Sequence, residues 1–273
     1  MRLFAISDLH LDHAANWAAL IQMPAQPADW LIVAGDVAEK ISHFRKAMDL
    51  LSHRFARIIW TPGNHDLWRI PTDGKSRRGL AKYLQLVEIC REFGVSTPED
   101  PYLQWPKSDS PLFIAPTFTL YDYTFRPDAV LAEDALAWAE VSGVMATDEL
   151  LLHPDPYPSR QAWCHARCRA TEERLAETAV HGNIILINHF PLRYDLVNLK
   201  SIPRFSLWCG TKLTEDWHKR FPVTAVVYGH LHIPGTHYRD GIRFEEVSLG
   251  YPKNWQPAQG ILPYLRQIWP HPS

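Results

Sequence analysis

The chain has 273 residues, a formal net charge of -2 and a hydrophobic fraction of 46%. This length predicts one large domain or two small ones, with a sizeable core, and the small charge excludes a protein that gathers long nucleic acids or anionic membranes through its overall field. Four scattered cysteines exclude a disulfide scaffold. No stretch has the apolar length of a membrane helix or the features of a secretory leader, so we expect a cytoplasmic protein.

The first seventy residues alternate between short apolar runs and amphipathic segments. We predict strands at 3–7, 30–34 and 57–61, and helices at 14–23 and 41–53 between them. This βαβαβ order implies a parallel sheet whose strands all end at one edge.

A similar pattern returns later in the chain. Strands are expected at 183–187 and 223–228, and the alternating segment 242–249 is expected to pair antiparallel and close this half. We therefore expect a single domain, residues 1–273, whose core is built from both halves.

The middle of the chain, residues 69–180, has a different character. Helices are predicted at 78–93, 128–142 and 159–178, with Asp128 as the N-cap of the second, and the loops between them are rich in proline and aromatic residues. We expect residues 69–180 to form an inserted, mainly helical cap that selects the substrate and supplies no metal ligand.

A polar cluster follows each of five predicted strands. Because strand ends of a parallel sheet share one edge, these clusters should converge on one cleft. Carboxylate and imidazole groups suit Mn²⁺, Fe or Zn²⁺, and no cysteine lies in any of the clusters to favour a thiolate site. The clusters are Asp8-Leu9-His10, Gly35-Asp36, Gly63-Asn64-His65-Asp66, Asn188-His189 and Gly229-His230-Leu231-His232.

These five motifs, in this order, resemble those of the calcineurin-like metallophosphoesterase superfamily. The resemblance covers both core halves and implies a four-layer α/β/β/α sandwich that hydrolyses phosphomonoesters or phosphodiesters with water activated by two metal ions. It also implies roles for His65, which would assist the leaving group, and for Asp66, which would orient His65. One metal would be bound by Asp8, His10 and His232, the other by Asn64, His189 and His230, with Asp36 bridging the two.

A narrower resemblance concerns the substrate. The segments Thr119-Leu120-Tyr121-Asp122-Tyr123 and Asn188-His189-Phe190-Pro191 are similar to a bacterial branch that includes 4'-phosphopantetheinyl hydrolases. A small phosphoester or a carrier protein is therefore the expected partner. Arg193, Tyr121 and Tyr123 are predicted to bind substrate, because arginine binds phosphate bidentately and aromatic rings stack on organic groups. The alternative for the tyrosines is that they pack the core of the insertion.

Two other functions remain open from the sequence. A nuclease of the same superfamily is one, although the chain lacks the positive charge that long nucleic acids require. A non-catalytic metal-binding scaffold is the other, although all seven ligands and His65 are retained. The donor set accepts Mn²⁺, Fe or Zn²⁺ without selecting among them.

Overall fold

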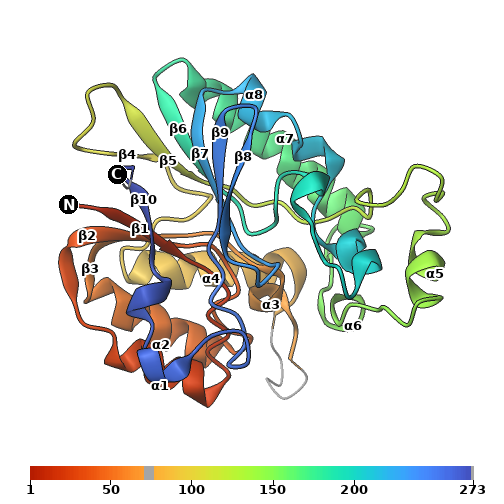
Figure 1. Cartoon of the computed structure of the whole chain (residues 1–273), viewed down its shortest axis with the longest axis horizontal. Helices are drawn as coiled ribbons and strands as arrows, with labels where there is room; N and C mark the ends of the chain where they lie inside the picture. The colour runs from red at the N-terminus through yellow and green to blue at the C-terminus, as the bar shows by residue number, and fades with distance from the viewer. Residues whose placement is uncertain (71–76, 272–273) are drawn as a thin grey trace.

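The computed structural model of the protein describes residues 1–70 and 77–271, which form two β-sheets packed face to face (Figure 1). One sheet has four strands in the order β10-β1-β2-β3, and the other has six in the order β4-β5-β6-β7-β9-β8. The first comprises β1 (Leu3–Ile6), β2 (Gln26–Val33), β3 (Phe55–Trp60) and β10 (Arg266–Trp269). The second comprises β4 (Leu103–Gln104), β5 (Leu112–Pro116), β6 (Asn183–Ile187), β7 (Val223–Tyr228), β8 (Gly235–Arg239) and β9 (Ile242–Glu246).

Helices cover the outer face of each sheet. One helical layer lies against the four-stranded sheet and another against the six-stranded sheet (Figure 1). The four-layer α/β/β/α sandwich implied by the sequence is thus confirmed. The first layer contains α1 (Ala14–Gln22), α2 (Ile41–Ser52) and α4 (Gly79–Glu92), and the second contains α7 (Arg160–Ala179) and α8 (Trp217–Arg220).

Side-chain alternation along the strands explains the layering. In β1, Leu3 and Ala5 point into the core between the two sheets, whereas Phe4 and Ile6 belong to the core beneath the helices. The strand is apolar throughout because both of its faces are buried, as expected in a sheet with neighbours on both sides. Ile185 and Val227 of the second sheet complete the inner core.

Strand direction determines where the site forms. β1, β2 and β3 are parallel to one another, and so are β5, β6, β7 and β9. The exceptions are edge pairs, in which β10, β4 and β8 each run antiparallel to one neighbour. The segment 242–249, expected to pair antiparallel, contains β9, which does pair antiparallel with β8; the parallel pairing of β9 with β7 was not expected.

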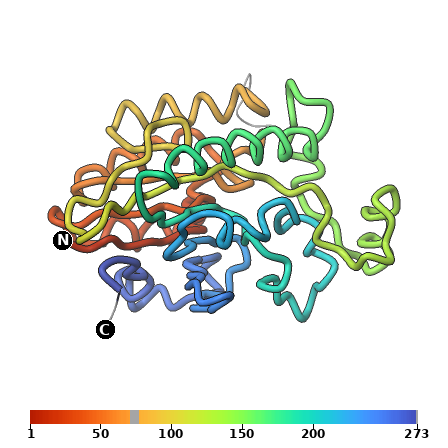
Figure 2. Tube along the Cα trace, turned by 90° about the horizontal axis from the view of Figure 1, so that it is seen from above, coloured from red at the N-terminus to blue at the C-terminus, as the bar shows by residue number. Residues whose placement is uncertain are grey.

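Residues 69–180 do not form a separate cap over their whole length. β5 lies within this span and pairs parallel with β6 in the middle of the second sheet, and α4 lies in the helical layer over the first sheet. The part that projects from the sandwich is the segment around α5 (Ala135–Glu140) and α6 (Asp148–Leu151), seen at one end of the molecule in Figures 1 and 2.

The helix expected at 128–142 is also shorter than predicted. It begins after Asp134, because the carboxylate of Asp128 instead pairs with Lys212 at 2.7 Å and the residues before α5 form turns. The helix expected at 159–178 is α7, and the hydroxyl of Ser159 caps it by accepting a hydrogen bond from the Ala162 amide at 3.1 Å. None of the helices within the described residues is long and apolar enough to cross a membrane.

Candidate metal centre

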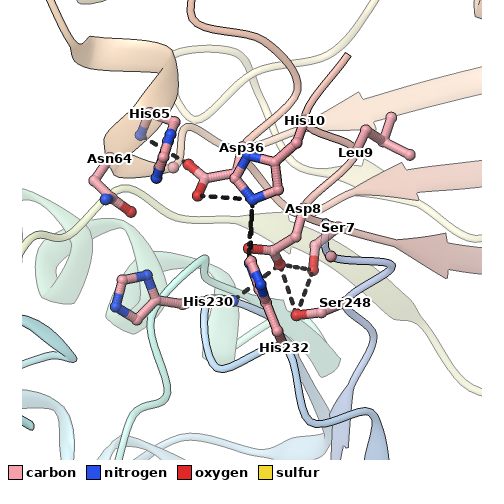
Figure 3. Close-up of polar contacts among 12 residues, drawn as sticks. Ser7, Asp8, Leu9, His10, Asp36, Asn64, His65, His230, His232 and Ser248 are labelled. Carbon is pink, nitrogen blue, oxygen red and sulfur yellow. Dashed lines mark hydrogen bonds and ion pairs between the residues drawn. The ribbon is translucent and has the colours of Figure 1, made fainter. Parts of the chain in front are cut away.

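The seven predicted ligands converge where the two sheets meet, and Figure 3 labels all of them except His189. The first sheet supplies residues that follow β1, β2 and β3, and the second supplies residues that follow β6 and β7. Since these strands are parallel within each sheet, their ends lie at one edge, as the sequence predicted. The first group is Asp8, His10, Asp36 and Asn64, and the second is His189, His230 and His232.

A direct backbone connection joins the sheets at this edge. The amide of Ser7 donates to the carbonyl of Val247 at 3.0 Å, and the amide of Leu249 donates back to Ser7 at 2.9 Å. The same junction brings the carboxylate of Asp8 within 3.0 Å of the backbone amide of His230. These hydrogen bonds therefore fix the positions of candidate metal ligands from opposite halves of the chain relative to one another.

One group of donors surrounds Asp8. The Nε2 atoms of His10 and His232 are 3.1 Å apart, and His232 Nε2 is 3.0 Å from Asp8 Oδ1. His10 Nε2 is also 3.9 Å from Asp36 Oδ2. These atoms enclose a point that a single cation could occupy.

A second group lies beside it and shares Asp36. His189 Nε2 is 3.2 Å from Asn64 Oδ1 and 3.5 Å from Asp36 Oδ2, and His230 completes the cluster. His230 Nε2 is buried and has no hydrogen-bond partner among the described residues. Asp36 Oδ2 thus lies between imidazoles of both groups, and the ligand types fit divalent cations.

The atoms that face away from the centre are already engaged. Asp8 Oδ2 accepts hydrogen bonds from Ser7 Oγ at 2.5 Å and Ser248 Oγ at 2.7 Å. Asp36 Oδ1 accepts one from the His65 amide at 2.9 Å. His189 Nδ1 donates to a backbone carbonyl at 2.8 Å, which directs its Nε2 inward. Such contacts orient metal ligands before a cation arrives.

Backbone conformation is strained at the same residues. Among the described residues, seven non-glycine residues have a positive φ, and five of these are predicted ligands. Each such residue costs about 1–3 kcal/mol and persists only where the surroundings enforce it. The strain therefore concentrates at the candidate site. The five are Asp8, His10, Asp36, His230 and His232, with φ between 41 and 73°.

Two glycines of the motifs are required by close approach. A Cβ on Gly63 would collide with the Asp36 side chain, and one on Gly229 would collide with Ser7 and Asp8. The sequence alone does not reveal this close approach. Any larger residue at either position would displace a carboxylate of the centre.

Burial and neighbouring charges separate the histidines electrostatically. Burial lowers the pKa of His10 and His230 to about 3, and the positive charge of neighbouring imidazoles adds to this effect. Burial also lowers the pKa of His189, but Asp36 and Asp8 outweigh it and raise the value to about 10. Without a cation, therefore, His189 holds a proton between the carboxylates, while His10 and His230 are neutral.

The predicted general acid, His65, lies at the rim of the two clusters. Its Nδ1 is 3.1 Å from Glu39 Oε1, and its ring packs on Trp68 with the centroids 3.6 Å apart. Burial lowers the pKa of His65, but the charges of Asp36 and Glu39 outweigh that effect and raise it. This environment favours the imidazolium form, which a proton donor requires.

Asp66 does not orient His65, contrary to the sequence prediction. Its Oδ1 accepts hydrogen bonds from the amides of Val37 and Ala38 at 2.8 and 3.2 Å, and its Oδ2 accepts one from Gly63 at 3.0 Å. These hydrogen bonds connect the loop that follows β2 with the loop that follows β3. Burial raises its pKa to about 6.

The predicted substrate-binding tyrosines are buried. Tyr121 is 0% exposed and packs against Phe190, and Tyr123 donates its hydroxyl to Glu149 at 2.7 Å. The alternative interpretation, packing of a core, is the one observed. Both were proposed because aromatic content is visible in a sequence, whereas side-chain direction in an irregular loop is not.

Arg193 is also unavailable for phosphate. Its guanidinium pairs with Asp195 at 2.8 Å and with Asp240 at 3.1 Å. Asp240 follows β8, whose length of five residues places it roughly 16 Å from the end that adjoins the centre. The prediction relied on the proximity of Arg193 to His189 in sequence, but the intervening residues leave the sheet edge.

Three residues of the site were not predicted from the sequence. Glu39 contacts His65, Asp148 accepts a hydrogen bond from Asn64 at 2.9 Å, and Tyr251 stacks on His10 with the centroids 4.4 Å apart. None belongs to a ligand motif. Glu39 alone carried a signal, because it follows the Gly35-Asp36 cluster by three residues.

The chain is similar to known phosphoesterases in sequence and structure. The calcineurin-like phosphoesterase family matches residues 1–234. The acyl-carrier-protein phosphodiesterase PptH of Mycobacterium tuberculosis is 48% identical over 99% of this chain and 84% of its own length. A crystal structure of the phosphopantetheinyl hydrolase PptH from the same organism superimposes with a TM-score of 0.94 and 47% identity, over 99% of this chain and 96% of that one.

Proposed function

Because this chain belongs to the calcineurin-like phosphoesterase family, we propose that the candidate ligands at the sheet edge hold two divalent cations and that the protein hydrolyses a phosphodiester there. Membership of the family implies divalent metal, and the chain is a hydrolase of phosphoric esters, as the motifs predicted. Our proposal goes beyond family membership in three respects, which are the number of cations, their ligands and the substrate.

The proposed ligand sets follow the two donor groups. Asp8, His10 and His232 would hold one cation and Asn64, His189 and His230 the other, with Asp36 shared. The single observation that carries this assignment is the position of Asp36 Oδ2, which lies 3.9 Å from His10 Nε2 and 3.5 Å from His189 Nε2. When bound, such cations neutralise phosphate oxygens and lower the pKa of water to near neutrality.

The protein groups have distinct parts in the proposed reaction. A water molecule loses a proton to solvent and its oxygen attacks phosphorus, and the bond from phosphorus to the leaving alkoxide breaks. His65 donates the proton that the alkoxide needs, and Glu39 holds the imidazolium in place through Nδ1. The Trp68 ring, tilted against that of His65 with the centroids 3.6 Å apart, restricts the rotation of the imidazole.

We further propose that the substrate is a carrier protein bearing a phosphopantetheinyl arm. The support is the 48% identity to an acyl-carrier-protein phosphodiesterase across nearly the whole chain. The net charge of -2 argues against a nuclease, which would need basic residues along a nucleic-acid groove. Retention of every proposed ligand argues against a scaffold without activity.

The projecting segment with α5 and α6 is the proposed substrate-selecting cap, in place of the whole 69–180 span. Its support is adjacency to the centre. α6 contributes Asp148, which touches Asn64, and α5 packs against the 3-10 helix Pro203–Trp208, whose Phe205 stacks on His230 at 6.1 Å between centroids. A partner bound at this end would border both donor groups.

The test is hydrolysis of holo-acyl carrier protein by the purified protein with added Mn²⁺, followed by mass spectrometry of the carrier. Loss of the phosphopantetheinyl arm is expected, at a rate well above that for single-stranded DNA under the same conditions. Hydrolysis of a small diester such as bis(p-nitrophenyl) phosphate reports on the metal centre alone. Activity on the small diester with an intact holo-carrier would contradict the proposed substrate.

A further inference from the structure

Asp148 lies on α6, outside every motif of the metal centre, yet its side chain joins two parts of that centre. Its Oδ1 accepts a hydrogen bond from Asn64 Nδ2 at 2.9 Å and another from Trp68 Nε1 at 2.6 Å. Only 1% of Asp148 is exposed. One oxygen atom therefore contacts both a proposed ligand and the ring that packs on His65.

The contact with Asn64 determines how its amide is turned. Asp148 Oδ1 also accepts from the indole N–H of Trp68, so this oxygen acts as an acceptor and selects the amide orientation that presents nitrogen to it. The amide oxygen of Asn64 then faces His189 Nε2 at 3.2 Å. In the reverse orientation the amide hydrogens would point toward the cation position and repel it.

α6 itself is held firmly. Arg160, on α7, donates to the backbone carbonyls of Asp148 and Glu149, both at 2.9 Å, and pairs with the Glu149 carboxylate at 2.7 Å. α7 lies against the second sheet, so the position of α6 is fixed relative to the strands that supply His189 and His230.

We propose that Asp148 is a positioning residue for the metal centre. It turns the Asn64 amide so that Oδ1 faces the cation shared with His189, and it keeps Trp68 against His65. The inference rests on the proposed function in taking Asn64 as a ligand. It adds that occupancy of one of the two cation positions depends on a helix of the projecting segment.

The experiment compares four full-length proteins: wild type, Asp148→Leu, Asp148→Asn and Glu149→Leu. Mn²⁺ binding is measured by calorimetry, and electron paramagnetic resonance distinguishes a coupled pair of ions from an isolated one. Asp148→Leu should weaken one of the two Mn²⁺ sites by about tenfold or more and produce the signal of an isolated ion. Asp148→Asn should bind as wild type does, because its amide oxygen can accept both hydrogen bonds.

Glu149→Leu is the matched control, because Glu149 lies on the same helix and accepts hydrogen bonds from Tyr123, Arg160 and Trp208 but touches no proposed ligand. It should lower thermal stability and keep both Mn²⁺ sites. Equal loss of the site in Glu149→Leu would assign the effect to the helix as a whole and overturn the proposal. If Asp148→Leu does not fold, Asp148→Ser, too short to reach Asn64, takes its place.

Two further outcomes separate this inference from the proposed function. Two tight, coupled Mn²⁺ ions in the wild type and in Asp148→Leu would overturn the positioning role and leave the two-cation site intact. A single Mn²⁺ ion in the wild type would overturn the two-cation proposal, and the positioning role with it.

Discussion

His65 Nδ1 lies 3.1 Å from Glu39 Oε1, so the proposed proton donor is held by a residue from the loop after β2 and not by its sequence neighbour Asp66. Glu39 is partly exposed, and its carboxylate raises the pKa of His65 and so favours the imidazolium form. This pairing makes the role of Glu39 accessible to mutation without loss of the metal centre.

Glu39→Gln should keep the hydrogen bond but remove the charge. The pKa of His65 is raised by Asp36 and Glu39, so loss of one charge lowers it. An acid catalyst loses activity as the pH rises through its pKa, and the alkaline limb of the pH–rate profile should therefore move to lower pH. We expect turnover near pH 8 to fall by about tenfold, with metal content unchanged by elemental analysis. An unshifted alkaline limb would contradict the pairing.

His65→Ala should depend strongly on the leaving group. An alkoxide needs a proton to depart, whereas p-nitrophenolate departs without one. Turnover of holo-acyl carrier protein should therefore fall by about 10²- to 10³-fold, and turnover of bis(p-nitrophenyl) phosphate by much less. Initial rates on both substrates, measured at equal metal content, provide the test. Equal losses on the two substrates would indicate a different role for His65.

Asp66→Ala should act on stability. Three buried backbone amides, those of Val37, Ala38 and Gly63, would lose their acceptor. We expect the free energy of unfolding of the metal-free protein to fall by about 3 kcal/mol, measured by chemical denaturation. A variant as stable as the wild type but inactive would restore the catalytic role that the sequence suggested.

Metal binding should release protons at pH 8. The raised pKa of His189, about 10, means that the metal-free protein carries a proton there, and a cation at Nε2 must displace it. His10 and His230, whose pKa values are lowered to about 3, have none to release at this pH. Calorimetry in buffers of different ionisation enthalpy should show net release of about one proton or more. The affinity for Mn²⁺ should rise with pH up to about 10, as His189 loses its proton. Binding without proton release would contradict the assignment of His189 as a ligand.

The proposed cap predicts a difference between large and small substrates. Leu150 on α6 is 75% exposed, and replacing it with Asp should raise KM for holo-acyl carrier protein while leaving bis(p-nitrophenyl) phosphate unaffected. Leu84 on α4, 43% exposed, is the matched control, and Leu84→Asp should change neither value. Parallel steady-state measurements provide the comparison. Identical carrier kinetics in Leu150→Asp and wild type would remove α6 from the substrate contact.

The convergence of the motif residues could be predicted because it depends on strand ends, and strand ends are visible in sequence. An apolar run followed by Asp8 or Asp36 marks both the strand and its edge. The missed strand β5 had a similar signal, since Leu112–Pro116 is an apolar run that ends at Pro116. No ligand motif follows this run, so its end is not marked in the way that Asp8 and Asp36 mark the ends of β1 and β2.

The contacts of Asp148 and Tyr251 could not be predicted, because they depend on how loops pack. Asp148 is 84 residues from Asn64, and nothing in the sequence connects an acidic residue of a short helix with a distant amide. The predicted substrate contacts of Tyr121 and Arg193 could not be judged from the sequence for the same reason, since tertiary contacts decide the direction of a side chain outside regular structure.

Because the proposed ligands come from both sheets, the order in which the chain is synthesised limits when the metal site can form. Asp8 and His232 are separated by 224 residues, and β1, which precedes Asp8, pairs with β10 at residues 266–269. While the ribosome is still making the second half, the nascent chain cannot enclose a cation between these partners. Cations held by the proposed ligands would thus be acquired only after both halves of the chain are made, and the cations free in the surroundings at that moment would decide which ones it receives.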